Sequence, residues 1–325
     1  MITLGIESTA HTLGIAITRD KEILSNTKKA YSTTQGGMRP VEVAEHHLQS
    51  IEALFQQSLK EANIQPKQID LIAFSISPGI GNTLKIGAAF ARSLSILLKK
   101  PLIGVNHCIA HLEIGKLRTQ ATDPVMLYAS GANTQIIAFT EGKYRIFGET
   151  LDIGIGNFLD TFARELGLGF PGGPLIEKQA QNGKLIPLPY SVKGMDMSFG
   201  GLLTNLKQKI QKKEYTTEDL CYSAQHIAFS QLIEVTERAL AHTQKKEIIL
   251  AGGVACNKTL QTMAQTMCKE RNATMYTPEN QFLVDNAAMI AWTGSIIYNA
   301  QGPTTIKESS IKPYERTDEI KVTWT

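Results

Sequence analysis

A strand, a short polar turn and a second strand open the chain, and the same pattern returns in its second half. The first copy is LGIESTAHTLGIAI, at residues 4–17, and the second is VMLYASGANTQIIAF, at residues 125–139. In both copies apolar and β-branched residues flank a turn rich in small and hydroxyl-bearing residues. Because the copies agree in pattern and length, the sequence predicts an internal duplication, with two similar halves facing a cleft.

Strand and helix signals alternate through both halves, as expected of a layered α/β fold. An apolar spacing of three and four after Pro40 predicts a helix whose buried stripe contains Val41, Ala44, Leu48, Ile51 and Phe55. LIAFSIS, PLIGV, YRIFGET and EIILAGG are expected strands, with helices ending near Leu94, around Asp160–Leu166, over 200–243 and from near Ala255. We expect a first lobe of residues 1–112 plus 292–325 and a second lobe of residues 113–291, with the last helix packing back on the first lobe.

Composition excludes several classes of protein. With 325 residues, 42% of them hydrophobic and 19% charged, the chain can bury two cores, and it has no apolar run long enough to span a bilayer. The start, MITLGIESTA, lacks the basic and apolar segments of a secretion signal, which favours the cytoplasm. Four widely separated cysteines indicate reduced, buried thiols. A net charge of +3 leaves nucleic-acid binding open, and the basic segment KQKIQKKE fits either phosphate contacts or a solvated helix face.

Two histidines form the clearest candidate for a metal site. His107 and His111 lie four residues apart in NHCIAHLEIGKL, so a helix would project both imidazoles from one face. The pair either binds a metal, which needs at least a third ligand, or simply lines a helix. A zinc protease would need a glutamate after the first histidine, where this chain has Cys108, expected to be core filler. The adjacent His46 and His47 diverge on a helix, so we expect one buried and one solvated ring.

Glycine loops and acidic residues supply further candidates. SPGIGN, GFPGGP and AGGVACN each adjoin a regular element, and together they favour a phosphate-bearing ligand, although each alone fits an ordinary turn. Asp285, before an apolar helix, could cap that helix or reach a metal. Asp160 and Glu177 could bind ribose or base hydroxyls and amines, or form surface salt bridges.

These motifs, with FPGGP, GNFLDTFARELG and the tail YERTDEIKVTW, resemble one known family over essentially the whole chain. The chain is similar to the archaeal and eukaryotic type of tRNA threonylcarbamoyladenosine synthase, the catalytic subunit of the KEOPS complex. The resemblance implies a two-lobed actin, Hsp70 and sugar-kinase-like fold of duplicated ribonuclease H-like halves. It also implies transfer of threonylcarbamoyl from threonylcarbamoyl-AMP, made by a separate enzyme, to the N6 amine of adenosine 37 in tRNAs that read codons beginning with A, with release of AMP.

The resemblance also implies a set of site residues and partners. One iron or zinc ion is expected, together with an adenylate or ATP-type ligand, and the partners are tRNA and the kinase, dimerisation and regulatory subunits of KEOPS. Two turns depart from the family pattern: Ala132 stands where a glycine is usual, and Gly200 where a serine is usual. The metal ligands implied are His107, His111, Tyr128 and Asp285, and the substrate-binding residues are Tyr128, Ala129, Ser130, Gly131, Ala132, Asp160, Gly173, Glu177 and Asn257.

The chemistry suggests a role for the ion. The exocyclic amine of adenosine is a poor nucleophile, so an ion that polarises a carbamate or phosphate oxygen would stabilise the charge that develops as AMP leaves. The ion could instead only anchor the ligand or the fold, and the sequence offers no evident general base. Other possibilities are a kinase or ATPase of the same fold, which would use Glu7 for magnesium-bound ATP, a zinc metalloprotease, and a non-catalytic scaffold.

Overall fold

The computed structural model describes residues 1–33 and 38–324, which form two compact units. Unit 1 contains Met1–Arg118 and Asp285–Thr325, and unit 2 contains Thr119–Val284. These contact-based units keep each long helix whole, whereas the lobe boundaries suggested by the sequence, after residue 112 and before residue 292, fall inside helices. Those lobe boundaries stay a prediction.

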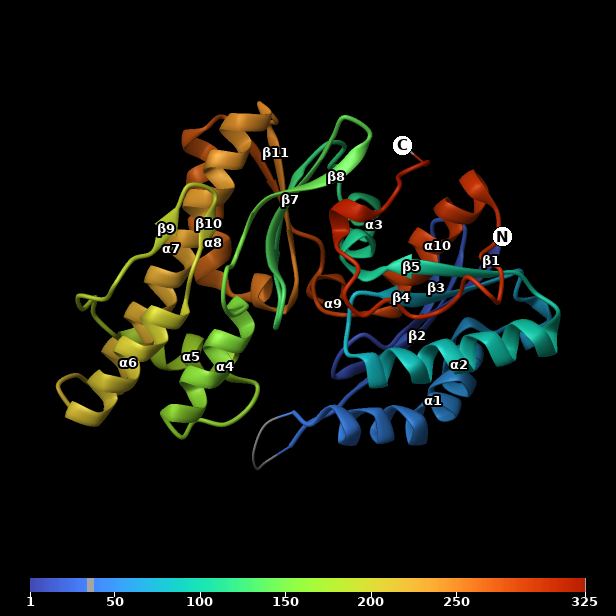
Figure 1. Ribbon diagram of the computed structural model, residues 1–325, viewed down its shortest axis with the longest axis horizontal. Helices are drawn as coiled ribbons and strands as arrows, with labels where there is room; N and C mark the ends of the chain where they lie inside the picture. The colour runs from blue at the N-terminus through green and yellow to red at the C-terminus, as the bar shows by residue number, and fades with distance from the viewer. Residues whose placement is uncertain (34–37, 325) are drawn as a thin grey trace. The chain divides into compact units, whose positions relative to one another are not determined.

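Unit 1 is a sheet of five strands between two layers of helices (Figure 1). The strand order is β3-β2-β1-β4-β5, in which the first three strands are antiparallel neighbours and β4 and β5 run parallel to β1. Helices α1 and α2 cover one face of the sheet, and α10 and α3 lie on the other. The elements are β1 (Ile2–Glu7), β2 (Thr12–Arg19), β3 (Glu22–Ala30), α1 (Pro40–Ala62), β4 (Leu71–Ser77), α2 (Gly81–Leu98), β5 (Leu102–Asn106), α3 (His107–Arg118) and α10 (Ala287–Gln301).

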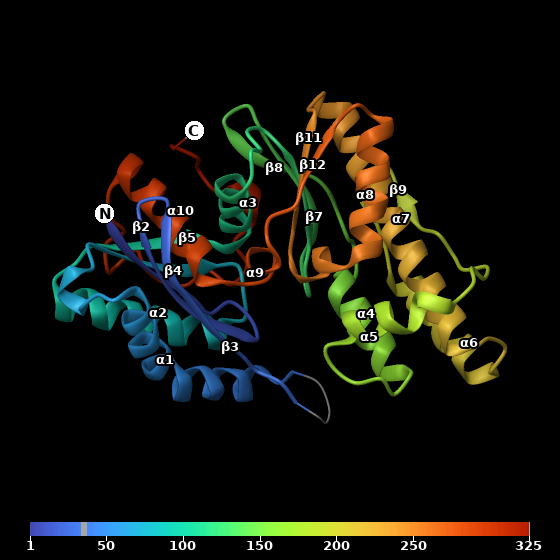
Figure 2. The same ribbon diagram turned by 180° about the vertical axis from the view of Figure 1, so that it is seen from behind.

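Unit 2 repeats the strand topology of this sheet with its own five strands (Figure 2). Its order is β12-β11-β6-β7-β8, with β6, β7 and β8 antiparallel and β11 and β12 parallel to β6. The elements are β6 (Val125–Ala129), β7 (Thr134–Thr140), β8 (Lys143–Glu149), α4 (Ile155–Glu165), α5 (Gly172–Gln179), β9 (Val192–Lys193), β10 (Asp196–Met197), α6 (Gly200–Lys212), α7 (Thr217–Thr243), β11 (Glu247–Ala251), α8 (Lys258–Glu270), β12 (Thr274–Tyr276) and α9 (Asn280–Leu283). The two sheets have one topology, which confirms the predicted duplication and the two-lobed α/β class.

A glycine after the fourth strand of each sheet shows how closely the two halves correspond. In unit 1, a Cβ added to Gly79 would lie 2.7 Å from the carbonyl oxygen of Thr9, in the β1–β2 turn. In unit 2, Gly252 has a φ of +93°, and its Cβ would lie 2.3 Å from the carbonyl oxygen of Ala129, beside the β6–β7 turn. Both loops therefore need glycine so that the hairpin turn can pack against them. Packing explains these glycines, and the phosphate contact expected from the loops stays a prediction.

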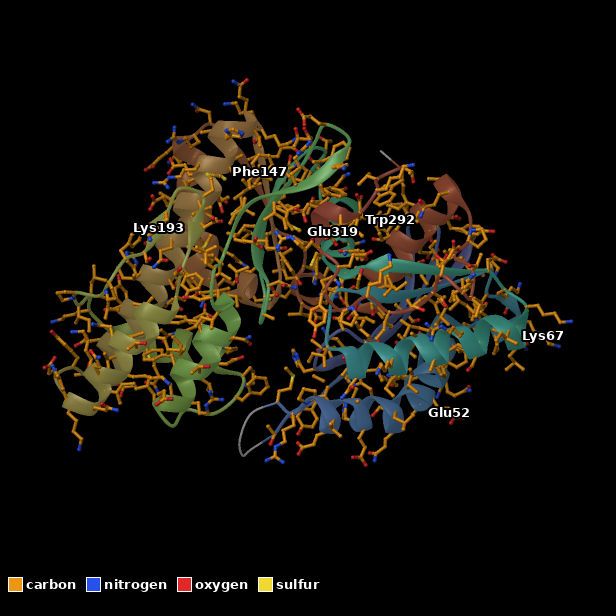
Figure 3. All side chains as sticks on the ribbon, viewed as in Figure 1. Glu52, Lys67, Phe147, Lys193, Trp292 and Glu319 are labelled. Carbon is orange, nitrogen blue, oxygen red and sulfur yellow. The ribbon has the colours of Figure 1, made fainter. Side chains whose placement is uncertain are left out.

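The helix predicted after Pro40 is confirmed, but its predicted buried stripe is partly wrong. Val41 and Leu48 are 69% and 62% exposed. Glu52, one helical turn after Leu48, is exposed as well, on the helix α1 labelled in Figure 3. The buried face instead contains His47, whose Nε2 lies 3.0 Å from the carbonyl oxygen of Ala10. A pattern drawn from apolar residues alone misses a histidine that is buried because the fold gives it a hydrogen-bond partner. His46 is half-buried rather than solvated.

Other sequence expectations have clear outcomes. The last long helix, α10, packs across the sheet of unit 1, as expected. Gly5 and Gly294 permit this close contact, because a Cβ on either would come within 2.4 Å of an atom of the facing element. In the part of the chain that the structure describes, the four cysteines form no disulfide bond, and three of them, including Cys108, are buried. Within residues 1–33 and 38–324, no helix is both long and apolar enough to cross a membrane.

Candidate metal centre

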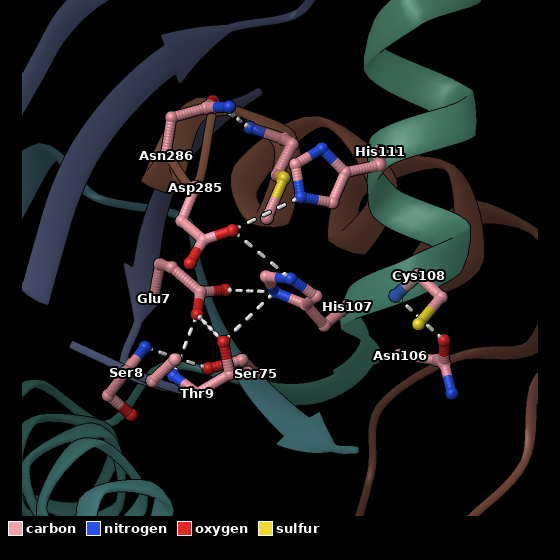
Figure 4. Close-up of polar contacts among 12 residues, drawn as sticks. Glu7, Ser8, Thr9, Ser75, Asn106, His107, Cys108, His111, Asp285 and Asn286 are labelled. Atoms are coloured by element: carbon pink, nitrogen blue, oxygen red, sulfur yellow. Dashed lines mark hydrogen bonds and ion pairs between the residues drawn. The ribbon is translucent and has the colours of Figure 1, made fainter. Parts of the chain in front are cut away.

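The two candidate histidines lie at the start of α3, directly after β5. The side-chain oxygen of Asn106 accepts hydrogen bonds from the backbone N–H groups of Cys108 and Ile109, at 3.0 and 3.2 Å, and so fixes where the helix begins. The spacing of four residues then puts both imidazoles on one side of α3, with ring centroids 4.8 Å apart (Figure 4). The helix predicted from the spacing of His107 and His111 is confirmed.

Asp285 completes the cluster, and the residue after it, Asn286, caps the next helix. The side chain of Asn286 accepts from the backbone N–H of Met289 at 3.0 Å and is the N-cap of α10. The alternative that Asp285 caps this helix is therefore wrong. Its Oδ1 instead lies 3.4 Å from Nε2 of His107 and 3.3 Å from Nε2 of His111, as Figure 4 shows.

The three side chains fit a metal ion by their chemistry as well as by distance. The two imidazole nitrogens and one carboxylate oxygen lie within 4.8 Å of one another, and within the described residues this is the one group of three such side chains that does so. Both histidines are buried, and Asp285 has a side-chain exposure of 16%. Two imidazoles with one carboxylate suit zinc or non-haem iron.

Burial and charge favour the metal-binding protonation states of two of these groups, His111 and Asp285. Burial lowers the pKa of the His111 imidazole, although a hydrogen bond with Asp285 opposes that change. Burial alone would raise the pKa of Asp285, but the charge of His107 and hydrogen bonds from both imidazoles hold this pKa well below its usual range. A neutral imidazole and an ionised carboxylate are the metal-binding forms of these residues.

The sequence did not reveal that Glu7 and Thr9 also belong to this cluster. Oε2 of Glu7 lies 3.0 Å from Nδ1 of His107, and Oε1 accepts from the backbone N–H and the hydroxyl of Thr9, at 2.7 and 2.5 Å (Figure 4). An acidic residue two positions before a threonine, at the tip of a strand, was the available signal. The sequence linked Glu7 only to a kinase-like role.

The remaining predicted metal ligand and part of the predicted substrate site lie in unit 2, around the β6–β7 turn. Tyr128 is the next-to-last residue of β6 and is 1% exposed. Backbone N–H groups at the start of α4 donate to the carbonyl oxygens of Ser130 and Gly131, at 3.0 and 2.9 Å, so the turn packs against that helix. Ala132 is outside the left-handed region, so its extra methyl group fits the turn. The ligand and substrate roles of residues 128–132 stay predictions.

The other predicted substrate-binding residues in unit 2 meet at two helix starts. Oδ1 of Asp160, on α4, accepts from the backbone N–H of Gly172 at 2.7 Å, next to Gly173. Oε1 of Glu177, on α5, accepts from the first backbone N–H of α8 at 2.7 Å. Asn257 caps α8, and its Nδ2 donates to a buried glutamine at 2.7 Å. These residues are brought together within one unit, and their contact with substrate stays a prediction.

The second departure from the family pattern, at Gly200, has a structural counterpart. The backbone N–H of Gly200 donates to Oδ2 of Asp152 at 2.7 Å, and a Cβ on this residue would lie 2.8 Å from the same oxygen. Burial opposes the ionised form of Asp152, but backbone hydrogen bonds from Phe199, Ile153 and Gly200 lower the pKa of its carboxyl below the usual value. A charged side chain therefore occupies the space beside Gly200 at the start of α6.

Comparison with known proteins decides the family. The family model for tRNA N6-adenosine threonylcarbamoyltransferase matches residues 22–292. The chain belongs to this transferase family. A transferase of this name from Thermococcus sibiricus is 52% identical, over the full length of both chains, and one from Thermococcus kodakarensis is 51% identical over the same extent. A Methanosarcina acetivorans relative, named as a bifunctional tRNA threonylcarbamoyladenosine biosynthesis protein, is 50% identical over 99% of this chain and 59% of that relative.

Solved structures of more distant proteins share the fold of this transferase family member. Full-length HypF in a phosphate- and nucleotide-bound form superposes with a TM-score of 0.64, at 10% identity, over 93% of this chain and 56% of HypF. Component A of the (R)-2-hydroxyglutaryl-CoA dehydratase of Acidaminococcus fermentans gives a TM-score of 0.55, at 15% identity, over 90% of this chain and 97% of that protein. At such identities the likeness concerns the fold alone.

Proposed function

We propose that this chain transfers the threonylcarbamoyl group from threonylcarbamoyl-AMP to the N6 amine of adenosine 37, beside the anticodon, in tRNAs that read codons beginning with A. The observation that carries the proposal is the buried convergence of His107, His111 and Asp285 in a chain of this transferase family. Tyr128 is proposed as the fourth ligand of one iron or zinc ion. The shared donor chemistry of two nitrogens and oxygen supports either metal.

The reaction is an acyl transfer that balances without an oxidant or reductant. The N6 amine attacks the carbamoyl carbon, the bond from that carbon to the phosphate oxygen breaks, and AMP leaves with the bonding electrons while the amine loses a proton. An ion held by His107, His111 and Asp285 would supply a Lewis acid for an oxygen of the substrate. His111 remains neutral because it is buried, and the ionised Asp285 contributes one negative charge to the ligand set. No side chain is assigned as a general base.

The substrate-binding part of the proposal concerns unit 2. We assign the threonylcarbamoyl-AMP contacts to residues 128–132, Asp160, Gly173, Glu177 and Asn257. Support comes from their clustering at the β6–β7 turn and at the starts of α5 and α8, where backbone N–H groups and carboxylates lie together. The expected partners are tRNA, the KEOPS subunits and a separate threonylcarbamoyl-AMP synthase, in the cytoplasm. The bifunctional name and greater length of the Methanosarcina relative support a multi-protein pathway.

Two alternatives have less support. A kinase or ATPase would use Glu7 to hold magnesium-bound ATP, but both oxygens of this carboxylate already face Thr9 and His107. A zinc protease would need a glutamate at the position of Cys108, which is buried and 1% exposed. A scaffold without catalysis gives no reason for two imidazoles and a carboxylate to meet in a buried cluster.

A single substitution tests the proposal. His111→Ala should remove the bound iron or zinc, and transfer to tRNA should fall by about 100-fold or more. The control is His242→Ala, which removes an exposed imidazole on α7. Purified proteins would be analysed for metal content and then supplied with ATP, threonine, bicarbonate, the adenylate-forming enzyme, partner subunits and tRNA, with modified nucleosides measured by mass spectrometry. Undiminished transfer by His111→Ala would refute the role of the metal in transfer. If the metal were lost while transfer stayed full, the ion would have a structural role alone.

A further inference from the structure

A carboxylate without solvent contact lies behind one of the two histidines. Glu7 is the last residue of β1, and its side chain is 0% exposed. An ionised carboxylate in such a place is costly unless its oxygens accept hydrogen bonds. The topology explains this location. β1, β4 and β5 are parallel, so Glu7, at the carboxyl end of β1, and His107, directly after the carboxyl end of β5, lie at the same edge of the sheet.

The two oxygens of Glu7 have different partners. Oε1 accepts from the backbone N–H of Thr9 at 2.7 Å and from its hydroxyl at 2.5 Å. Oε2 lies 3.0 Å from Nδ1 of His107. The hydroxyl oxygen of Thr9 also lies 3.2 Å from that Nδ1. Thr9 therefore holds one end of the carboxylate, and the other end faces the imidazole.

These contacts dictate which nitrogen of His107 carries the proton. An ionised carboxylate can only accept a hydrogen bond, so Nδ1 must donate to Oε2. The Thr9 hydroxyl gives its single hydrogen to Glu7, so toward Nδ1 it too can only accept. The neutral imidazole that a metal requires has one N–H, and with that hydrogen on Nδ1 the lone pair is on Nε2. Without an ion, Nε2 can also carry a hydrogen and donate it to Asp285. Nε2 is the atom 3.4 Å from Oδ1 of Asp285.

We propose that Glu7 is a positioning residue, which fixes the tautomer and ring orientation of His107 so that Nε2 is the ligand atom. This inference rests on the metal site of the proposed function. A carboxylate bound to the second nitrogen of a ligating histidine orients the ring and makes the other nitrogen more basic, and its loss weakens metal binding by roughly 10- to 100-fold. Thr9 acts one step further out, because it orients the carboxylate.

Replacement of Glu7 by glutamine should reverse the tautomer while keeping the side-chain shape. The backbone N–H of Thr9 is a fixed donor, so the amide oxygen of glutamine should take the place of Oε1. The NH₂ group then faces Nδ1 of His107 as a donor and favours a lone pair there. The hydrogen moves to Nε2, where it obstructs metal binding.

Glu113→Gln is the matched control. Glu113 lies on the same helix as His107, is 4% exposed, and accepts from Nε1 of Trp324 at 3.3 Å. Its substitution removes one buried negative charge from α3 without touching either imidazole in a described contact. A loss of metal affinity that came only from removing buried charge would appear in both variants.

The test uses Co²⁺ as the probe. Its dissociation constant would be measured by chelator competition in wild type, Glu7→Gln and Glu113→Gln, and the His107 tautomer by ¹⁵N NMR of the metal-free proteins. We expect the dissociation constant of Glu7→Gln to rise roughly 10- to 100-fold, that of Glu113→Gln to stay within about twofold, and Nδ1 of His107 to lose its hydrogen in Glu7→Gln alone.

Three results would overturn the role of Glu7: an unchanged Co²⁺ affinity in Glu7→Gln, an equal loss in Glu113→Gln, or an Nδ1 of His107 without a hydrogen in the metal-free wild type. Thermal unfolding checks that each variant is folded. If Glu7→Gln does not fold, the wild-type tautomer decides, because it needs no substitution. A wild-type protein that binds no Co²⁺ would refute the metal site of the proposed function. The His107 tautomer of that protein would still test the role of Glu7.

Discussion

Two adjacent glycines at the start of α5 allow substrate binding to be separated from packing. At Gly172, an added Cβ would lie 2.6 Å from Cβ of Ala163 and 2.8 Å from the carbonyl oxygen of Leu159. At Gly173, the nearest atom to an added Cβ is Cδ1 of Leu159, at an ordinary 3.8 Å. Only Gly172 is therefore required by the contact of α5 with α4, although Gly173 is the residue predicted to bind substrate.

The two alanine variants should differ in stability. Overpacking at Gly172 cannot be relieved by a flexible side chain, so Gly172→Ala should lower the free energy of unfolding by about 2–3 kcal/mol. For a unit of this size, such a loss lowers the melting temperature by roughly 4–12 °C. Gly173→Ala should change the free energy of unfolding by less than about 1 kcal/mol, toward higher stability, because alanine restricts the unfolded chain.

Activity should separate the variants in the opposite way. If threonylcarbamoyl-AMP approaches the backbone at Gly173, one methyl group there should raise its KM by roughly 10-fold or more, as expected for 1–3 kcal/mol of lost binding. Urea unfolding gives the stability, and steady-state transfer to tRNA gives kcat and KM. A KM for Gly173→Ala equal to that of wild type would refute the assignment to substrate, and a fully stable Gly172→Ala would refute the packing argument.

Three further outcomes are expected. Burial and the charge of His46 lower the pKa of His47 to about 4, so the unfolded chain takes up a proton near pH 6.5 that the folded chain does not. Urea unfolding should show that this residue alone costs about 2 kcal/mol of stability as pH falls from 6.5 to 4. His47→Gln should remove that part of the loss, while the part from His46 and His111, whose pKa values are also lowered, should remain. Burial raises the pKa of Cys221 to about 12 and that of Cys268 to about 11, so neither thiol should react readily near neutral pH. Mass spectrometry after iodoacetamide treatment at pH 7.5 should find both unmodified, and rapid labelling of either thiol in the folded protein would contradict this expectation. Asn286→Ala should cost about 1 kcal/mol of stability through loss of the α10 cap, as thermal unfolding followed by circular dichroism would check. Asp285→Asn should keep the cap and lose the metal, as elemental analysis would check. A loss of stability in Asp285→Asn and none in Asn286→Ala would contradict the assignment of the cap.

The strands could be predicted because two sequence signals agree at their positions, an apolar run and the turn-forming residues on either side of it. LIAFSIS matches β4 (Leu71–Ser77) residue for residue, since an apolar run bounded by polar and glycine-rich segments fits a strand buried on both faces. The short β12 (Thr274–Tyr276) carries too few residues for a period to show, and the sequence missed it. Burial of His47 depends on the carbonyl of Ala10, which belongs to another element, so no pattern along α1 could reveal it.

The candidate site divides in the same way. The spacing of His107 and His111 indicated a shared helix face, because that relation is local. The place of Asp285 was left open between a cap and a metal ligand; the cap made by Asn286 excludes the first, and the second stays a prediction. Glu7 was missed as a partner of His107 because 100 residues separate them, and their contact depends on the order of the strands in the sheet.

The position of Asp285 also bears on when the proposed ion could bind during synthesis. This residue is 174 positions after His111, and all of unit 2 is made in the interval. A growing chain emerges from the ribosome with its amino-terminal part first, so the histidine pair exists well before the carboxylate that joins it. A nascent polypeptide therefore offers at most two of the three proposed ligands, and tight binding of an ion would wait until translation has passed the second sheet.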